Sequence, residues 1–177
     1  MALIKRVKLI EPSEDYKDEY IDMVNEWVTF DEKSIPPVLK MEYSDFEALV
    51  TYLKDIRDGK QLQKGWVPSS TFWLISDDGK IIGISSIRHF LTEQLLEFGG
   101  HIGYGIRPSE RKKGYATEIL CQSLKVAGAL GIQKALLTCD KDNIGSIKVI
   151  EKSGGSLESE GKINDVDILR YWIEASK

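Results

Sequence analysis

Six consecutive residues, Arg111-Lys112-Lys113-Gly114-Tyr115-Ala116, have the types and the spacing that suit the binding of phosphate. They precede the apolar pattern of a helix, and a helix N-terminus presents unpaired N–H groups and the positive end of a dipole. Gly114 has no Cβ and lets the backbone approach an anion closely, while Ala116 is too small to obstruct it. Cations at this end of a helix oppose the dipole unless an anion compensates them. The loop therefore indicates a phosphate site, and the alternative is a merely solvated basic turn.

Two better-known phosphate motifs do not occur in the sequence. It contains no G-x-x-x-x-G-K-[ST], and no G-x-G-x-x-G follows a predicted strand. Gly103 and Gly105 lie inside a strand pattern, where glycine more often marks a bulge or a close backbone contact. Other kinds of phosphate site therefore fit this sequence worse than the loop at 111–116.

The wider pattern around the loop is similar to a known family. The run HIGYGIRPSERKKGYATEIL resembles the central motif of the GNAT superfamily of N-acetyltransferases, whose [R/Q]-x-x-G-x-[G/A] signature matches Arg111, Gly114 and Ala116. Further along the chain, Asn143 to Ser146 followed by Gly154 resembles the family's second cofactor motif, N-x-x-[A/S] ahead of a short helix and a glycine. The two motifs cover residues 101–155 and stand at the separation found in the family.

The resemblance implies where acetyl-CoA, the expected cosubstrate, would bind. The fourth and fifth strands, 101–106 and 134–139, would splay apart and hold acetyl-CoA between them. Its pyrophosphate would rest on backbone N–H groups of residues 111–116, and its pantetheine arm would pair with the strand edge near Ile106. Asn143 and Ser146 of the second motif would face the same arm. Asn143 has a second interpretation, as the N-cap of the helix that follows it.

The resemblance also implies direct attack of an amine on the thioester in a ternary complex, without an acyl-enzyme. A backbone N–H near Ile106 would stabilise the tetrahedral oxyanion. Many family members carry a tyrosine seven residues after the asparagine, where it protonates the leaving thiolate. This chain has Ile150 at that position, so the usual general acid is missing.

Three residues before or on the fourth strand are candidates for proton transfer: Glu97, His101 and Tyr104. Histidine has an ordinary pKa of about 6.5, which suits proton transfer near neutrality. A lone strand histidine is nevertheless more often structural, and Glu97 is equally consistent with a surface charge. Cys139, at the end of a strand, has no recognisable neighbouring base that would activate its thiol.

The elements that must position these residues follow from periodicity and turn signals. Apolar residues at helical spacing predict helices that begin near Ser13, Ser44 and Gly114, together with a short helix at 144–152; Ser44 and Glu47 form an expected capping box. Strands are expected at 5–10, 71–76, 80–90, 101–106, 134–139 and in a hairpin that turns at Asn164-Asp165, whereas 91–98 is ambiguous. The fold class is mixed α/β. The resemblance implies a GNAT-like, largely antiparallel central sheet with helices on both faces. It also implies that residues 1–177 form a single acetyltransferase domain.

Bulk properties exclude several classes of protein. The net charge of −4 argues against a nucleic-acid partner, which requires a basic surface. No run approaches the ~20 apolar residues that cross a bilayer, so no membrane association is expected. The two cysteines match neither a disulfide scaffold nor a metal-ligand spacing, so we expect no metal and a reduced, cytoplasmic setting.

The leading hypothesis is an acetyl-CoA-dependent N-acetyltransferase acting on a primary amine of a small molecule or a peptide. The acceptor site should form from the first two helices, the 60–70 loop and the last hairpin. Residues 1–60 contain 14 acidic and 9 basic residues, which among amines slightly favours a cationic acceptor. The more common explanation of such a charge is a solvated helix face. The alternatives are a CoA-binding sensor without transfer activity and a partner-binding module in which the basic loop is incidental. A homodimer is consistent with how common two-fold oligomers are.

Overall fold

The computed structural model describes residues 5–30 and 37–175. Its elements in chain order are β1 (Val7–Ile10), the 3-10 turn η1 (Glu14–Tyr16), α1 (Lys17–Thr29), η2 (Pro37–Lys40), α2 (Phe46–Arg57), β2 (Ser69–Ser76), β3 (Ile81–Arg88), α3 (Glu93–Glu97), β4 (Ile102–Ile106), η3 (Pro108–Glu110), α4 (Tyr115–Ala129), β5 (Lys134–Asp140), α5 (Ile144–Lys152), β6 (Ser156–Ile163) and β7 (Val166–Glu174). The order agrees with the sequence-based expectation, and the ambiguous segment 91–98 contains the short helix α3.

The strands form two antiparallel sheets. The first has the order β1-β2-β3-β4 and the second the order β5-β7-β6. Tight turns set the register of two hairpins: Gly79 (φ +82°) closes β2–β3, and Asn164 and Asp165, both with positive φ, close β6–β7. The expected single mixed sheet is thus divided between β4 and β5, and the expectation of splayed fourth and fifth strands is confirmed.

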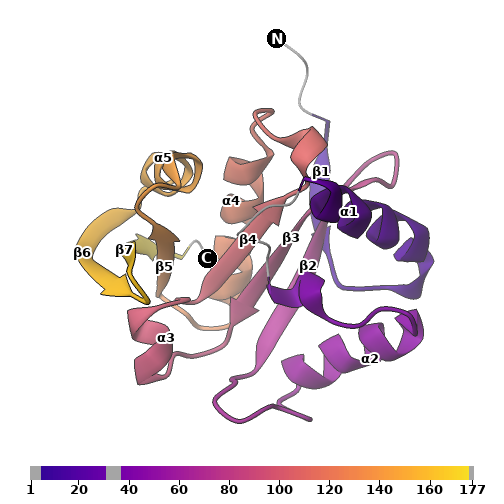
Figure 1. Cartoon of the computed structure of the whole chain (residues 1–177), viewed down its shortest axis with the longest axis horizontal. Coiled ribbons are helices and arrows are strands. Elements are labelled where there is room, and N and C mark those ends of the chain that lie inside the picture. Colours follow the sequence, from indigo (N-terminus) through magenta and orange to yellow (C-terminus); the bar gives the residue numbers. More distant parts are fainter. Residues whose placement is uncertain (1–4, 31–36, 176–177) are drawn as a thin grey trace.

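Helices cover both faces of the first sheet (Figure 1). Apolar residues of α1 and α2 pack with Trp73 and Ile84 on one face, and those of α4 pack on the other face and against the second sheet. Asp45, not Ser44, caps α2 by accepting a hydrogen bond from the Ala48 N–H at 3.0 Å, so the expected capping box is wrong. Helix α2 begins at Phe46, so the residue that directly precedes it and whose side chain can reach the N3 amide is Asp45.

Among the described residues, backbone hydrogen bonding joins the two sheets at the start of β4. The backbone N–H of His101 donates to the Leu136 carbonyl at 2.7 Å, and Nδ1 of the same histidine accepts from the Leu136 N–H at 2.9 Å. A Cβ on Gly100 would lie 2.3 Å from the Leu136 carbonyl oxygen, so only glycine permits this approach. Beyond this point no ladder joins β4 to β5. The strands therefore form a V that is closed at His101 and open toward the phosphate loop.

Among the described residues, no helix combines the length and the apolar composition that crossing a bilayer requires.

Candidate functional site

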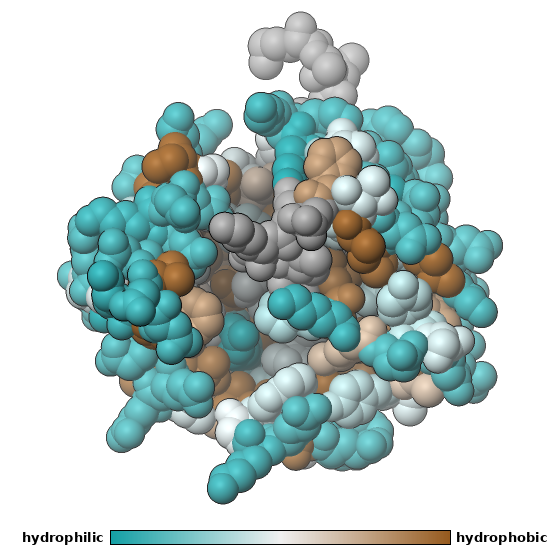
Figure 2. Space-filling model, viewed as in Figure 1, coloured by the Kyte–Doolittle hydropathy of each residue, from teal (hydrophilic) through white to brown (hydrophobic). Residues whose placement is uncertain are grey.

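One large cavity connects the open V with the α1–α2 face of the first sheet. Its volume is about 1290 Å³, and Figure 2 shows the hollow at the centre of that face, with hydrophobic side chains inside it. Its β4–β5 half is lined by β4, β5, α5 and the start of α4. Its α1–α2 half is lined by α1, η2, α2, the segment 64–71, α3 and the side chains of Ser86 and Arg88 on β3.

The N-terminus of α4 opens into the cavity without a capping side chain. Its N-cap, Gly114, has φ +89°, and Lys112 also has positive φ. Among the described residues, the backbone N–H groups of residues 112–116 have no hydrogen-bond partner. By contrast, Asp45, Thr92 and Asn143 cap α2, α3 and α5 with their side chains. The start of α4 is thus a cluster of free donors at a positive dipole end, which is the geometry of an anion site.

The basic side chains of the loop point in different directions. Arg111 donates from Nε to the Ile106 carbonyl at 2.9 Å, and its guanidinium lies 6.0 Å from the Trp27 ring centroid. Lys113 pairs with Glu110 at 2.9 Å, while Lys112 is exposed. The backbone, more than these three side chains, is therefore what the loop presents to the cavity.

An ion cluster fixes the turn that precedes this loop. Arg107 is 2% exposed; Asp22 and Glu26 of α1 pair with its guanidinium, and Glu19 lies 3.7 Å away. Glu26 also accepts from the Ser109 N–H. Burial opposes the charge on Arg107, but these carboxylates outweigh it and raise the Arg107 pKa. Three of the 14 acidic residues in 1–60 thus pair with an internal cation, which weakens the basis for expecting a cationic acceptor.

The edge of β4 that faces the V has free backbone groups. Arg88 N–H donates to the His101 carbonyl and Arg107 N–H to the Ile82 carbonyl, which sets the phase of the β3–β4 ladder. In an antiparallel ladder alternate residues bond to the neighbouring strand. The N–H groups of Tyr104 and Ile106 therefore point away from β3, into the open V.

The second motif lies on the opposite side of the V. Asn143 caps α5, since its Oδ1 accepts from the Ser146 N–H at 3.1 Å, and its side-chain NH₂ has no partner among the described residues. Both Asn143 and Ser146 line the cavity. Ile150, where many relatives have tyrosine, is 1% exposed in the apolar core.

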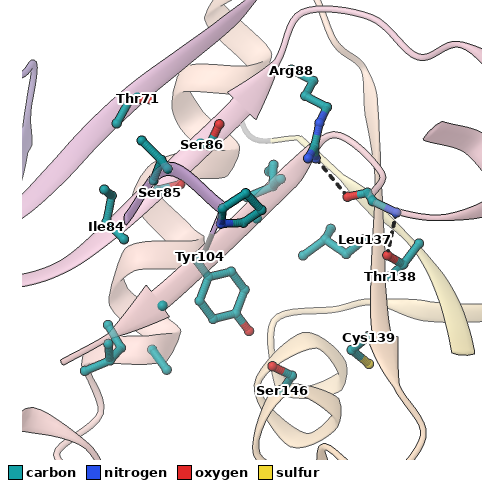
Figure 3. A pocket seen from close by; sticks show the side chains of 18 of the residues that line it. Thr71, Ile84, Ser85, Ser86, Arg88, Tyr104, Leu137, Thr138, Cys139 and Ser146 are labelled. Carbon is teal, nitrogen blue, oxygen red and sulfur yellow. Dashed lines mark hydrogen bonds between the residues drawn. The ribbon is translucent and has the colours of Figure 1, made fainter. Parts of the chain in front are cut away.

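Tyr104 points into the V from β4. Its hydroxyl is buried, has no hydrogen-bond partner among the described residues, and is directed toward Ser146 of α5 (Figure 3). Burial raises the pKa of Tyr104 to about 12. The side chain therefore keeps its proton at neutral pH and can donate a hydrogen bond to a group that enters the V.

His101 and Glu97 have other surroundings. His101 is 8% exposed and uses Nδ1 to accept from Leu136, and burial together with the charge of Arg88 lowers its pKa. In this tautomer Nε2 carries the proton, so neither ring nitrogen is available to take up another. Glu97 is exposed, lies 3.5 Å from Arg170 and does not line the cavity. Of the three candidates, only Tyr104 lines the cavity.

Cys139 lines the cavity but is not an activated thiol. Burial, together with the charges of Asp140 and Glu151, raises its pKa to about 11. Since the thiolate is the nucleophilic form, a covalent acyl-cysteine is disfavoured at this position. No cluster of three or more potential metal ligands occurs within the described residues.

The α1–α2 half of the cavity differs in part from the expected acceptor site. Trp27 and the exposed Trp66 line it, as do residues of α2 and the 64–69 segment. No residue of the last hairpin, β6–β7, contributes; α3 and Phe98 stand there instead, because the V carries the second sheet away from this face. Sequence reasoning missed Thr71, Ser86 and Arg88, although their period-of-two spacing on predicted strands places them on one face.

Comparison with known proteins identifies the fold and the family. A family model described as the GNAT acetyltransferase domain matches residues 6–156. The crystal structure of the microcin C7 self-immunity acetyltransferase MccE in complex with acetyl-CoA and AMP is 19% identical, with a TM-score of 0.68 over 95% of this chain and 92% of that one. The spermidine N-acetyltransferase from Vibrio cholerae in complex with CoA and spermine is 17% identical, with a TM-score of 0.66 over 96% and 95% of the two chains. A search of curated proteins by sequence finds no match.

Proposed function

Since this chain belongs to the GNAT acetyltransferase family, we propose that it transfers the acetyl group of acetyl-CoA to a primary amine by direct attack in a ternary complex. The observation that carries the proposal is the juxtaposition of two sets of free backbone donors in one cavity. The uncapped N-terminus of α4 offers its N–H groups at one end of the V, and the open edge of β4 runs from there inward. Acetyl-CoA needs both: an anion site for its pyrophosphate and a strand-like partner for its pantetheine amides.

The residues proposed to hold acetyl-CoA follow from this arrangement. The N–H groups of residues 111–116 would bind the pyrophosphate, although that of Arg111 already donates to Pro108. The edge at Ile106 would pair with the pantetheine arm, and the free amide of Asn143 and the hydroxyl of Ser146 would contact it from the other side. Both relatives described above are complexes with acetyl-CoA or CoA, which supports this choice of cosubstrate.

For the chemical step, the chain supplies positioning and hydrogen bonds. Acetyl-CoA contributes an activated thioester; the amine nitrogen forms the new C–N bond while the C–S bond breaks. The Ile106 N–H would donate to the carbonyl oxygen as negative charge develops on it. The Tyr104 hydroxyl would donate a hydrogen bond to the departing sulfur, and the proton that remains on CoA would come from the amine. Tyr104 packs against the apolar cluster that contains Ile150, where the family's usual tyrosine is missing.

The amine must lose its excess proton before it attacks. A lysine-like ammonium has a pKa of about 10.4. No histidine is among the described residues that line the cavity, and Glu110, one of its three described carboxylates, is paired with Lys80 and Lys113. We propose that water in the open cavity accepts the proton. Residues 1–177 would form one such catalytic domain acting in a reducing, cytoplasmic setting, with Cys121 and Cys139 both free.

Calorimetric titration with acetyl-CoA tests the proposal. Gly114→Asp places a carboxylate and a Cβ at the anion site and should abolish binding. Gly131→Asp is the matched control, because Gly131 also has φ +89°, lies beyond the other end of α4 and would meet no atom within 4 Å. Unchanged affinity in folded Gly114→Asp would refute the phosphate loop. Binding without turnover on any amine would favour the CoA sensor.

A further inference from the structure

Arg88 is the last residue of β3 and lines the α1–α2 half of the cavity. Its Nη1 donates to the carbonyls of Gly99 and Gly100 at 3.0 and 2.9 Å. Figure 3 draws the first of these two bonds. These two bonds hold the guanidinium in one place. Nε and Nη2 have no partner among the described residues, so part of the fork of donors remains available to a ligand.

Among the described residues, the charge of Arg88 has no counter-ion. No described carboxylate lies within ion-pair distance of it, and partial burial lowers its pKa. Arg107, which is fully buried, has carboxylates of α1 paired to its guanidinium. Arg88 is half-buried at the wall of the cavity, where a partly desolvated guanidinium gains from an anion beside it. Position 88 therefore favours a bound anion.

The surrounding wall fits an elongated polar molecule. Thr71, Ser86 and Arg88 lie on the same face of the sheet as Ile84, and the hydroxyls of Thr71 and Ser86 have no hydrogen-bond partner among the described residues. Gly103 pairs with Ser86 and adds no side chain, so a ligand can lie close to the sheet there. The described carboxylates of the cavity wall are those of Glu110, Asp140 and Asp142; Glu110 is already paired with Lys80 and Lys113, and Asp140 and Asp142 follow β5.

From these observations we propose that the acceptor is an amine that also carries a carboxylate, and that Arg88 binds this carboxylate. The inference rests on the proposed acetyl transfer. The reacting nitrogen would lie beside Gly105, which pairs with Ile84, four residues before Arg88 on β3. Four residues of strand span about 13 Å. The nitrogen and the carboxylate would therefore be separated by about 10–13 Å, which excludes short α-amino acids reacting at their α-amino group and selects long ω-amino acids or short acidic peptides.

Three amines of equal length test the proposal: aminooctanoate, octylamine and diaminooctane, which end in an anion, a methyl group and a cation. With acetyl-CoA saturating, kcat/KM should be roughly tenfold to a hundredfold higher for aminooctanoate than for octylamine, the range for hydrogen bonds to a charged group. Diaminooctane should be the poorest acceptor. Equal values for the three amines, or a preference for the diamine, would overturn the proposal.

Variants of Arg88 separate anion binding from its structural bonds. Arg88→Gln keeps an N–H donor for the glycine carbonyls but removes the charge, and should lose the preference for aminooctanoate. Arg88→Lys should keep part of it. If the substitution of Arg88 only displaced the segment that contains Gly99 and Gly100, kcat/KM would fall for both aminooctanoate and octylamine, and the ratio of the two values would stay unchanged. Lys64→Met, which removes an exposed cation from the same wall, should change the ratio by less than about fivefold.

A binding measurement distinguishes failure of this inference from failure of the proposed function. Calorimetric titration of the CoA-bound protein with aminooctanoate needs no turnover and should show binding that Arg88→Gln weakens at least tenfold. If acetyl-CoA binds and octylamine is acetylated while aminooctanoate neither binds nor reacts better, the anion site is refuted and acetyl transfer remains. If acetyl-CoA itself does not bind, the proposed function fails first.

Discussion

Replacement of His101 by alanine tests whether this residue holds the V together or transfers a proton. Its imidazole closes the V at the only point where β4 and β5 share backbone hydrogen bonds, through Leu136. Removal of the ring leaves the Leu136 N–H buried without an acceptor. We therefore expect His101→Ala to lose stability, and to lose turnover only to the extent that the V changes shape.

The size of the effect follows from the lost contacts. A buried N–H without a partner costs about 1–3 kcal/mol. The ring also packs against Trp172, with centroids 6.3 Å apart at 60°, a contact worth about 0.5–1.5 kcal/mol. The expected loss is about 2–4 kcal/mol, which for an m value near 2 kcal/mol/M lowers the urea midpoint by about 1–2 M.

The stabilisation by His101 should also depend on pH, in a direction that follows from its pKa. Burial and the charge of Arg88 lower the pKa of His101 below its ordinary value of 6.5. The unfolded chain then binds the proton more readily than the folded one, so the stabilisation is complete above about pH 6.5 and is lost as pH falls through the folded pKa. Urea unfolding between pH 8 and pH 5 should show the gap between wild type and His101→Ala closing below about pH 6.5, by at most about 1.4 kcal/mol per pH unit.

His101→Asn is the matched control, because its Oδ1 can accept from the Leu136 N–H where Nδ1 does. It should retain more stability than His101→Ala, remain active and lack the part of the acidic decline that His101 contributes; His89, whose pKa burial also lowers, is unchanged in all three proteins. If both variants unfold like wild type yet lose turnover about equally, the clamp is refuted and a proton-transfer role for His101 is restored.

Three further predictions concern the catalytic step and its support. Tyr104→Phe removes the hydroxyl that faces Ser146; steady-state kinetics should show kcat falling roughly tenfold to a hundredfold with the KM for acetyl-CoA nearly unchanged, and an unchanged kcat would remove Tyr104 from the mechanism. Arg107→Met should lower the free energy of unfolding, measured with urea, by about 2–4 kcal/mol, because it breaks a buried ion cluster. Glu26→Gln should lower it more than Asp22→Asn does, since the side chain of Glu26 is 17% exposed and that of Asp22 67%. The kcat/KM for an amine should rise about tenfold per pH unit toward the amine's pKa of ~10, whereas a plateau near neutral pH would reveal a protein base.

Features that depend on neighbouring residues could be read from the sequence. The order of helices and strands, the glycine at the start of α4 and the capping role of Asn143 all agree with the structure. Backbone preferences act over one or two turns of chain, so local residue types determine them. The family also followed from local motifs, since a cofactor loop is a run of adjacent residues.

What only the tertiary structure decided is how side chains far apart in sequence pair or fail to pair. A histidine ordinarily has a pKa that suits a base, yet Nδ1 of His101 accepts from the Leu136 N–H, 35 residues further along the chain, and the pKa of His101 is lowered. The acidic charge of residues 1–60 suggested a cationic acceptor, but three of those carboxylates, on α1, pair with Arg107, which lies 85 residues beyond Asp22. Arg88 was not noticed at all, because an arginine at the end of a strand is unremarkable in sequence. The structure draws attention to Arg88 because its side chain is partly buried and no described carboxylate pairs with it. Both properties depend on the elements packed around it.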